Sequence, residues 1–333
     1  MKKILFITTQ YRVGERIYPI IPILSEQYEL HLLKSYQMSS SYQWTGDRDL
    51  RNEFDLKYLK YFTKVFDSKY ESLDYDLIIC DDNRDSVKTP LKEIYKKSKC
   101  KVVSCYHGNG SDAEVERNFK KVFDHCFVFG EKDNKFEWTI PGGIPSNDLL
   151  KHYQHVAKKH ILVIVNFLGN RMSPEKVNFD EAFFSNSNLI ELQRYYNLPI
   201  VIKLKSRADE GIYLKNVQYL NSIIKNLTYE IVVDTEDDNK LIAESACVIS
   251  AFSTLAFKPI QLGIPTVLIK DSGPIGTFGD YDGIFKLQDN FQNYLLSYSK
   301  KSDFIKSTIE GGDSFSSTEI MVEQITNIIN ENN

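Results

Sequence analysis

Short apolar runs alternate with stretches of helical period along this chain. In the first half, five such runs predict strands at 3–9, 28–34, 76–82, 101–107 and 125–130. In the second half, five more predict strands at 160–167, 199–205, 229–235, 246–252 and 265–270. Apolar residues recur at helical spacing between several of these runs, at 15–26, 88–98 and 113–122. Strands that are apolar on both faces and separated by helices indicate parallel sheets that are covered on both sides.

Two sets of such strands predict an α/β fold with two Rossmann-like, doubly wound parallel-sheet domains. The length of 333 residues agrees with two domains, because a single hydrophobic core seldom serves so long a chain. The best linker is 139–160, where two Pro and two Gly precede a charged helical stretch. We therefore expect an N-terminal domain at 1–148 and a second domain at 149–315.

The end of the chain, 316–333, predicts a terminal helix. The segment "SSTEIMVEQITNIINE" (316–331) opens with a capping-box-like region, Ser317–Glu319, and continues with apolar residues at i, i+4 spacing. We expect this helix to pack back on the N-terminal domain.

The composition limits which binding partners and which cellular compartment are expected. Hydrophobic residues make up 42% and charged residues 26% of the chain, as in ordinary soluble globular proteins. The net charge of −4 gives no electrostatic reason to expect a nucleic-acid partner. Five cysteines without a C-x-x-C pair are interpreted as free thiols in a reducing compartment. No stretch reaches the roughly 18 apolar residues of a membrane span, and the opening "MKKILFITTQ" is interpreted as a strand rather than a signal peptide. The expected location is the cytoplasm.

The segment "YHGNGSD" (106–112) marks the end of a predicted strand with a titratable side chain. Ligands of open parallel sheets bind beyond the carboxyl ends of the strands, so His107 is our candidate general base. The glycines on either side of Asn109 permit close backbone approach to a ligand, so Gly108 and Asn109 are further candidate site residues, as is Arg16. The alternative is a histidine that caps the next helix or bonds within its own loop.

Three strand ends in the second half offer groups for a phosphate. Ser253 and Thr254 follow one strand and begin a helix, where hydroxyls and unpaired backbone N–H groups together suit an anion; the alternative is plain N-capping by Ser253. The other two loops follow the first and second strands of this half, and their candidates are Gly169, Arg171, Lys203 and Lys205. Because Lys203 and Lys205 alternate onto the same face of a strand, one of them can be merely solvent-exposed.

Motifs of other enzyme classes are missing from the sequence. No G-x-G-x-x-G follows the first strand, and there is neither a P-loop nor a G-x-S-x-G elbow. Three D-x-D pairs occur, but none comes immediately after a strong strand. We therefore expect no cofactor and no metal site.

The chain resembles the GT-B glycosyltransferase superfamily in layout and in three segments. "VISAFSTLAFKPIQLGIPTVLI" (248–269) is similar to its donor-binding segment, and "CYHGNGSD" (105–112) to the His-Gly segment of CDP-glycerol glycerophosphotransferases. The latter segment also occupies the place of the general-base segment of bacterial sialyl- and polysialyltransferases. "PGGIPSNDLL" (141–150) is similar to the stretch that joins the two domains in the glycerophosphotransferases. Two positions depart from the pattern: "KLKSRAD" (203–209) stands where a His-Pro is common, and Lys258 stands where a Glu is common.

The resemblance implies two domains that face each other across a cleft and a metal-independent, inverting transferase. In such an enzyme, Gly108, Asn109 and Arg16 would lie on the acceptor side. Its donor would be a nucleotide-activated sugar or polyol phosphate, and its acceptor a glycan or glycolipid of a bacterial surface polysaccharide. Peripheral association with the inner face of the membrane goes with such an acceptor. Two alternatives remain open at this point. One is a nucleotide-sugar epimerase or hydrolase of the same fold, and the other is a non-catalytic nucleotide- or glycan-binding protein.

Overall fold

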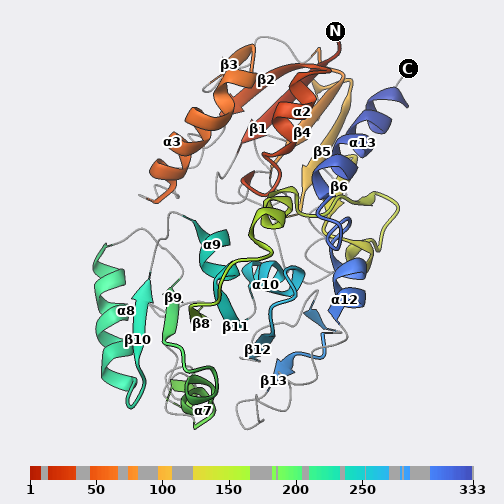
Figure 1. Cartoon of the computed structure of the whole chain (residues 1–333). Helices are drawn as coiled ribbons and strands as arrows, with labels where there is room; N and C mark the ends of the chain where they lie inside the picture. The colour runs from red at the N-terminus through yellow and green to blue at the C-terminus, as the bar shows by residue number, and fades with distance from the viewer. Residues whose placement is uncertain are drawn as a thin grey trace. The chain divides into compact units, whose positions relative to one another are not determined.

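The computed structural model divides into two compact units. The first comprises Met1–Leu149 and Lys306–Asn333, and the second comprises Leu150–Ile305 (Figure 1). The residues that the structure describes are 1–8, 14–34, 46–66, 74–81, 97–106, 123–165, 182–184, 187–204, 210–232, 237–251, 253–269, 278–279, 281–285 and 301–331.

The first unit contains, in its described part, a seven-stranded parallel sheet in the order β3-β2-β1-β4-β5-β6-β7. Its strands are β1 (Lys3–Thr8), β2 (Glu29–Lys34), β3 (Lys64–Phe66), β4 (Leu77–Cys80), β5 (Lys101–Cys105), β6 (His125–Val128) and β7 (Thr139–Pro141). Its helical elements include α2 (Ile20–Ser25), α3 (Gly46–Tyr58), η2 (Leu59–Tyr61), η4 (Glu131–Asp133) and α13 (Ser317–Asn330). Apolar residues of α2, α3 and α13 pack in one core against a single face of this sheet, among them Ile21, Phe54 and Ile325.

The second unit contains, among its described residues, a six-stranded parallel sheet in the order β10-β9-β8-β11-β12-β13. Its strands are β8 (His160–Val165), β9 (Ile200–Leu204), β10 (Tyr229–Val232), β11 (Ser245–Ala251), β12 (Thr266–Ile269) and β13 (Ile284–Phe285). Its helical elements include α7 (Ser187–Tyr196), α8 (Glu210–Ile223), α9 (Asp238–Ala243), η6 (Thr254–Ala256) and α10 (Phe257–Gln261). Two further helical elements, η5 (Pro145–Tyr153) and α12 (Lys301–Thr308), run across the divisions between the units.

The six-stranded sheet is covered on both faces. Leu192 of α7 and Leu220 of α8 share a core with Ile202, whereas Ile242 of α9 shares a different core with Val201 on the opposite face. Successive side chains of a strand point to opposite faces, so the two neighbours Val201 and Ile202 serve two separate layers. The predicted fold class, two Rossmann-like parallel-sheet α/β domains, is confirmed.

Both sheets reverse their strand order at one place. In each, the first strand of the unit lies beside the fourth, so the reversal falls between β1 and β4 and between β8 and β11. Open α/β sheets bind ligands beyond the carboxyl ends of their strands at such a switch point. A ligand site is therefore expected at the carboxyl ends of these two strand pairs.

The ten strands predicted from the sequence are present, and three short ones were not predicted. These three are β3, β7 and β13. Each has only two or three residues and is an edge strand of its sheet. Of the predicted helices, 113–122 lies outside the described residues, as does 88–98 apart from its last two residues.

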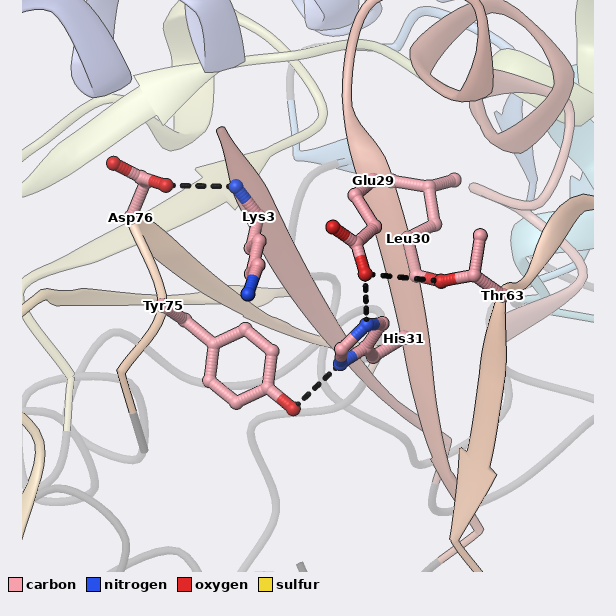
Figure 2. A network of polar contacts seen from close by, with 7 residues as sticks. All are labelled: Lys3, Glu29, Leu30, His31, Thr63, Tyr75 and Asp76. Atoms are coloured by element: carbon pink, nitrogen blue, oxygen red, sulfur yellow. Dashed lines mark hydrogen bonds and ion pairs between the residues drawn. The ribbon is translucent and has the colours of Figure 1, made fainter. Parts of the chain in front are cut away.

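The amino ends of β1 to β4 are joined by polar contacts on the edge opposite the expected ligand side (Figure 2). The buried His31 ring contacts Tyr75 Oη at 2.9 Å through Nδ1 and Glu29 Oε1 at 2.8 Å through Nε2, and the Lys3 backbone N–H donates to Asp76 at 2.7 Å. The hydrogen bond with His31 lowers the pKa of the Glu29 carboxyl. Because the folded-state pKa is the lower one, this stabilisation is present above the ordinary titration range and is lost as the pH falls through the lowered value.

The first backbone N–H groups of the terminal helix α13 are capped by the side chain of Asp148, a residue far from the helix in the sequence. Asp148 accepts hydrogen bonds from the backbone N–H groups of Ser317, at 3.1 Å to Oδ1, and Thr318, at 2.6 Å to Oδ2. The N-cap residue, Ser316, makes no side-chain capping bond. The predicted capping box at Ser317–Glu319 is therefore wrong. Its Ser317 hydroxyl instead donates to the carbonyl of Glu310, at 2.6 Å, so it is already engaged.

The segment before Asp148 fits closely against this helix start. Gly143 has φ of 71°, and a Cβ built on it would lie 2.3 Å from the Ser317 hydroxyl. A side chain at this position would be strained both by its backbone conformation and by the lack of space. The proline- and glycine-rich stretch that the sequence suggested as a linker thus also packs against the start of α13.

Replacing Asp148 with alanine should lower the free energy of unfolding by about 2 kcal/mol, because a buried and a half-buried helix N–H group lose their acceptor. The midpoint of urea unfolding measures this effect. The matched control is Glu319→Ala, which removes an exposed carboxylate from the same helical turn and should cost less than about 0.5 kcal/mol. Equal losses in the two variants would contradict the assignment of the cap to Asp148.

Candidate functional site

A pocket in the first unit lies at the carboxyl ends of its strands. Asp81 follows β4, Tyr106 follows β5, Phe129 follows β6 and Gly143 follows β7, and all four line this pocket. The complete lining is Arg16, Ile17, Asp81, Cys105, Tyr106, Phe127, Phe129, Gly143 and Met321. This pocket is small, with a volume of about 10 Å³, or room for about one water molecule, and it places one carboxylate, one guanidinium and several aromatic rings at the edge where the fold binds ligands.

Asp81 is the buried acidic group of this pocket, with 1% of its surface exposed. Its backbone N–H donates to the carbonyl of Ile7 at 3.2 Å, which ties it to β1 at the switch point. The Tyr18 hydroxyl donates to its Oδ2 at 3.2 Å. A Cβ built on Gly14 would lie 2.2 Å from the Tyr18 hydroxyl and 2.5 Å from Asp81 Oδ2, so only glycine fits here. A carboxylate is the type of group that accepts hydrogen bonds from hydroxyl groups, as Asp81 does here from Tyr18.

Arg16 and two aromatic rings form the rest of the polar wall. The guanidinium carbon of Arg16 lies 5.7 Å from the centre of the Phe129 ring, within the range of a cation–π contact. The Arg16 carbonyl accepts the backbone N–H of Ser146 at 2.8 Å, which fixes the backbone on which this side chain stands. Tyr106 meets Phe129 edge to face, with ring centres 5.3 Å apart. The structure thus places the predicted acceptor-side residue Arg16 in this pocket.

The candidate base and its neighbours lie outside the described residues. This applies to His107, Gly108 and Asn109 in the first unit. Tyr106 is the last described residue before them, and its backbone N–H donates to the carbonyl of Phe127 at 2.9 Å. His107 is thus the next residue along the chain from a pocket-lining side chain, and its role remains a prediction.

In the second unit, the predicted turn after β11 has the expected local structure. β11 ends at Ala251, and Ser253 is the N-cap residue of η6, with its hydroxyl accepting the backbone N–H of Leu255 at 3.3 Å. Thr254 is the first residue of η6, and both side chains are half-buried. Ser253 thus does make the bond of a plain cap. Since a hydroxyl that accepts one hydrogen bond still has a proton to donate, this cap is compatible with an anion ligand.

Of the predicted phosphate-binding cations, Lys203 lies within the described residues. It is 7% exposed near the carboxyl end of β9, and its Nζ pairs with Asp238 Oδ1 at 2.7 Å. Gly169, Arg171 and Lys205 lie outside the described residues. Ser253, Thr254 and Lys203 are therefore all placed at the carboxyl edge of the second sheet, in strands or turns beside its switch point.

Sequence reasoning missed two acidic residues that the structure brings into these sites. Asp81 was included in a predicted strand at 76–82, but β4 ends at Cys80, so Asp81 is the first residue beyond it. Asp238 starts a six-residue helix, too short to give a periodic signal. The tripeptide "CDD" after an apolar run could have indicated Asp81, because a carboxylate directly after a buried strand lies on the ligand edge.

The described residues offer neither a metal site nor a membrane-spanning helix. They contain no group of three or more His, Cys, Asp or Glu side chains arranged to hold a metal ion. No helix in the same part of the chain has the length and apolar character needed to cross a membrane.

The chain is similar in structure to an epimerase, a polymerase and a glycosyltransferase. The UDP-GlcNAc 2-epimerase from Neisseria meningitidis, solved with UDP-GlcNAc bound, has 13% identity and a TM-score of 0.58, covering 98% of this chain and 100% of its own. The wall teichoic acid polymerase TagF has 14% identity and a TM-score of 0.57, covering 99% of this chain and 89% of its own. A glycosyltransferase from Rickettsia africae has 11% identity and a TM-score of 0.56, covering 99% and 98%.

These likenesses establish the fold. All three are similar along nearly the whole chain, at identities that show no more than a common two-domain, Rossmann-like architecture. No protein-family profile matches the sequence, and no curated protein does so either. The two-domain, Rossmann-like fold expected from the sequence is therefore supported by these structures, and a shared fold does not by itself define an activity.

Proposed function

We propose that this protein is a glycosyltransferase, or a polyol-phosphate transferase, which uses a nucleotide-activated donor to build a bacterial surface glycan. The observation that carries this proposal is the difference between the two ligand edges. The first unit offers a pocket with a buried carboxylate and a guanidinium, whereas the second offers hydroxyls at a helical turn and a buried lysine. The former suits a hydroxyl-bearing acceptor and the latter suits a phosphate.

The proposed reaction assigns one role to each edge. His107 takes the proton of the acceptor hydroxyl, whose oxygen attacks the reacting centre of the donor as the bond to the nucleotide phosphate breaks. Asp81 and Arg16 orient the acceptor in the pocket. On the donor side, Ser253, Thr254 and Lys203, with Lys205, Arg171 and the Gly169 backbone, meet the charge that develops on the departing phosphate. These groups, rather than a metal, stabilise that charge. The in-line attack inverts the configuration of the reacting centre.

Two measurements in sequence test this function. A thermal-shift screen of UDP, CMP, CDP, GDP and dTDP should find one nucleotide that stabilises the protein by roughly 2.7 kcal/mol at 100 times its dissociation constant. The matching sugar or polyol donor is then incubated with and without glycan acceptors. Release of nucleotide that depends on an acceptor is the expected result. A chain that binds none of the five nucleotides would overturn the proposal in favour of a function without this class of donor.

The second candidate is a nucleotide-sugar epimerase or hydrolase. It is favoured by the similarity to UDP-GlcNAc 2-epimerases, one of them solved with its nucleotide sugar bound, and by the buried Asp81 carboxylate, which could also remove a proton from a sugar. Incubation with the donor alone separates the two functions. A changed sugar, or rapid release of nucleotide without any acceptor, would support this second candidate. Binding without turnover would instead indicate a nucleotide- or glycan-binding protein.

A further inference from the structure

Lys203 is a buried cation whose counter-charge is much more exposed than the lysine itself. The lysine side chain is 8% exposed, and the carboxylate of Asp238 that pairs with it at 2.7 Å is 36% exposed. An ammonium group that leaves water is destabilised by several kcal/mol unless an opposite charge and hydrogen bonds compensate for it. Asp238 supplies such a charge from the α9 side of the pair, at the surface of the unit.

The position of this pair in the sheet places it next to the switch point. Lys203 of β9 lies beside Ile164 of β8, and Ile164 lies beside Ser250 of β11. These three residues form one row across the sheet and share a face, so Lys203 and Ser250 are about 10 Å apart at their Cα atoms. β11 ends one residue after Ser250, and the capped turn at Ser253 follows. The buried cation thus lies at the same edge as the proposed phosphate-binding turn.

The residues on either side of Asp238 hold it in place. Asp237 accepts a hydrogen bond from the Tyr153 hydroxyl and from the Lys240 backbone N–H. Asn239 accepts one from Lys258 Nζ at 2.7 Å, which links this segment to α10. Three consecutive side chains therefore bind three different elements: η5, β9 and α10. The backbone of Asp238 is thus held opposite Lys203 by its neighbours in the chain, whereas its own side chain still reaches solvent.

We propose that Asp238 is the resident counter-charge of the donor site, and that a phosphate of the donor takes its place on the Lys203 ammonium. This inference rests on the proposed function for its ligand, a nucleotide-linked phosphate. The exposed carboxylate can turn to water when the anion arrives, whereas the buried ammonium cannot leave its position. Asp238 is thus a positioning residue that holds the Lys203 ammonium in place and weakens the binding of anions by competing for it.

A purely structural ion pair makes the opposite prediction for one variant. If the pair only fastens α9 to the sheet, removing either partner should have the same direction of effect, or none, on anion binding. If Asp238 competes with the ligand, removing its charge should tighten binding, whereas removing the lysine should weaken it. The sign of the change in the Asp238 variant therefore distinguishes the two readings.

Calorimetric titration of the full-length protein with inorganic pyrophosphate measures this sign. Asp238→Asn, which keeps an oxygen for Lys203 but no charge, should lower the dissociation constant about fivefold. Lys203→Met should raise it by about tenfold or more. Urea unfolding of both variants accompanies the titration, and a second variant, Asp238→Ser, is used if the asparagine variant does not fold.

Glu244→Gln is the matched control. Glu244 pairs with Lys159 at 2.6 Å, but this pair precedes β8 and β11 and so lies at the amino edge of the same sheet. Removing its charge should leave the pyrophosphate dissociation constant unchanged within about twofold, because a charge at the opposite edge of the sheet is largely screened. An equal tightening in this control would show a general effect of net charge and would overturn the proposal.

The remaining outcomes separate this inference from the proposed function. Weaker or unchanged pyrophosphate binding in Asp238→Asn overturns the counter-charge role, even if the wild-type protein turns over a donor. Opposite signs in the Asp238 and Lys203 variants support the role, even if no acceptor is found. A wild-type protein that does not bind pyrophosphate also overturns it, and turnover of a nucleotide-activated donor is then measured independently.

Discussion

Replacing His107 with alanine should lower the rate of transfer by about 100-fold or more, while the affinity for the donor nucleotide stays close to that of the wild type. A positioned general base contributes about 10² to 10⁴ in rate, and His107 is the next residue after Tyr106, which lines the pocket of the first unit. Single-turnover kinetics with saturating donor and acceptor measure the loss.

The pH profile adds a signature that a structural histidine would not give. An imidazole that acts as a base is inactive when protonated, so the wild-type rate should fall on the acid side of neutrality, and this limb should vanish in His107→Ala. His152, an exposed histidine of η5, provides the control, and His152→Ala should keep both rate and profile. A rate within about threefold of the wild type in His107→Ala would remove this residue from the mechanism.

If His107 is removed from the mechanism in this way, Asp81 becomes the candidate general base. Its carboxylate is buried at the β1/β4 switch point and lines the same pocket. Asp81→Asn keeps an acceptor for the Tyr18 hydroxyl, so the fold should survive the substitution. A larger loss of rate in Asp81→Asn than in His107→Ala would identify the carboxylate as the proton acceptor.

The sheets could be predicted from the sequence because their strands are apolar on both faces. "HILVIV" of β8 and "LIIC" of β4 have no alternation that could leave one face in water, so they predict parallel strands beneath two layers of helices. The edge strands could not be predicted in the same way. β3 has the exposed Val65 and Lys64, and its three residues carry no periodic signal.

The start of α13 shows why local rules failed where a distant residue intervenes. A Ser followed by a Glu before an apolar run is typical of a capping box. Here the acceptor of the first N–H groups is Asp148, which is 169 residues away from Ser317 in the sequence. No pattern within the helix indicates which residue caps it, because the cap depends on how the segment around Gly143 packs against the helix start.

The two candidate sites differ in how much the sequence revealed. Ser253 could be predicted as a cap because a strand, a small polar residue and a helix follow one another within "ISAFSTLAF". Asp238 and Lys203 could not be paired, because their contact joins β9 to α9, and β10 lies between these two elements in the sequence. A strand end predicts that a side chain lies on the ligand edge, but not which partner neutralises it.

Replacing both Ser253 and Thr254 with alanine should raise the dissociation constant of the bound nucleotide about 100-fold. Each hydroxyl that donates to a phosphate oxygen makes a charge-assisted hydrogen bond, whose loss costs on the order of 1.5–3 kcal/mol. The same change should lower the free energy of unfolding by only about 1 kcal/mol, the usual cost of a lost cap. Titration calorimetry and urea unfolding measure the two effects separately.

Ser253→Asn separates the cap from the ligand contact at this turn. Asparagine caps helices as well as serine does, so it should accept the Leu255 N–H and keep the stability of the wild type. Its larger amide replaces the hydroxyl that would face the phosphate, so nucleotide affinity should still fall by about tenfold. If the double alanine variant binds nucleotide as tightly as the wild type, then Ser253 serves η6 alone, and the donor phosphate has to be sought at Lys203 without this turn.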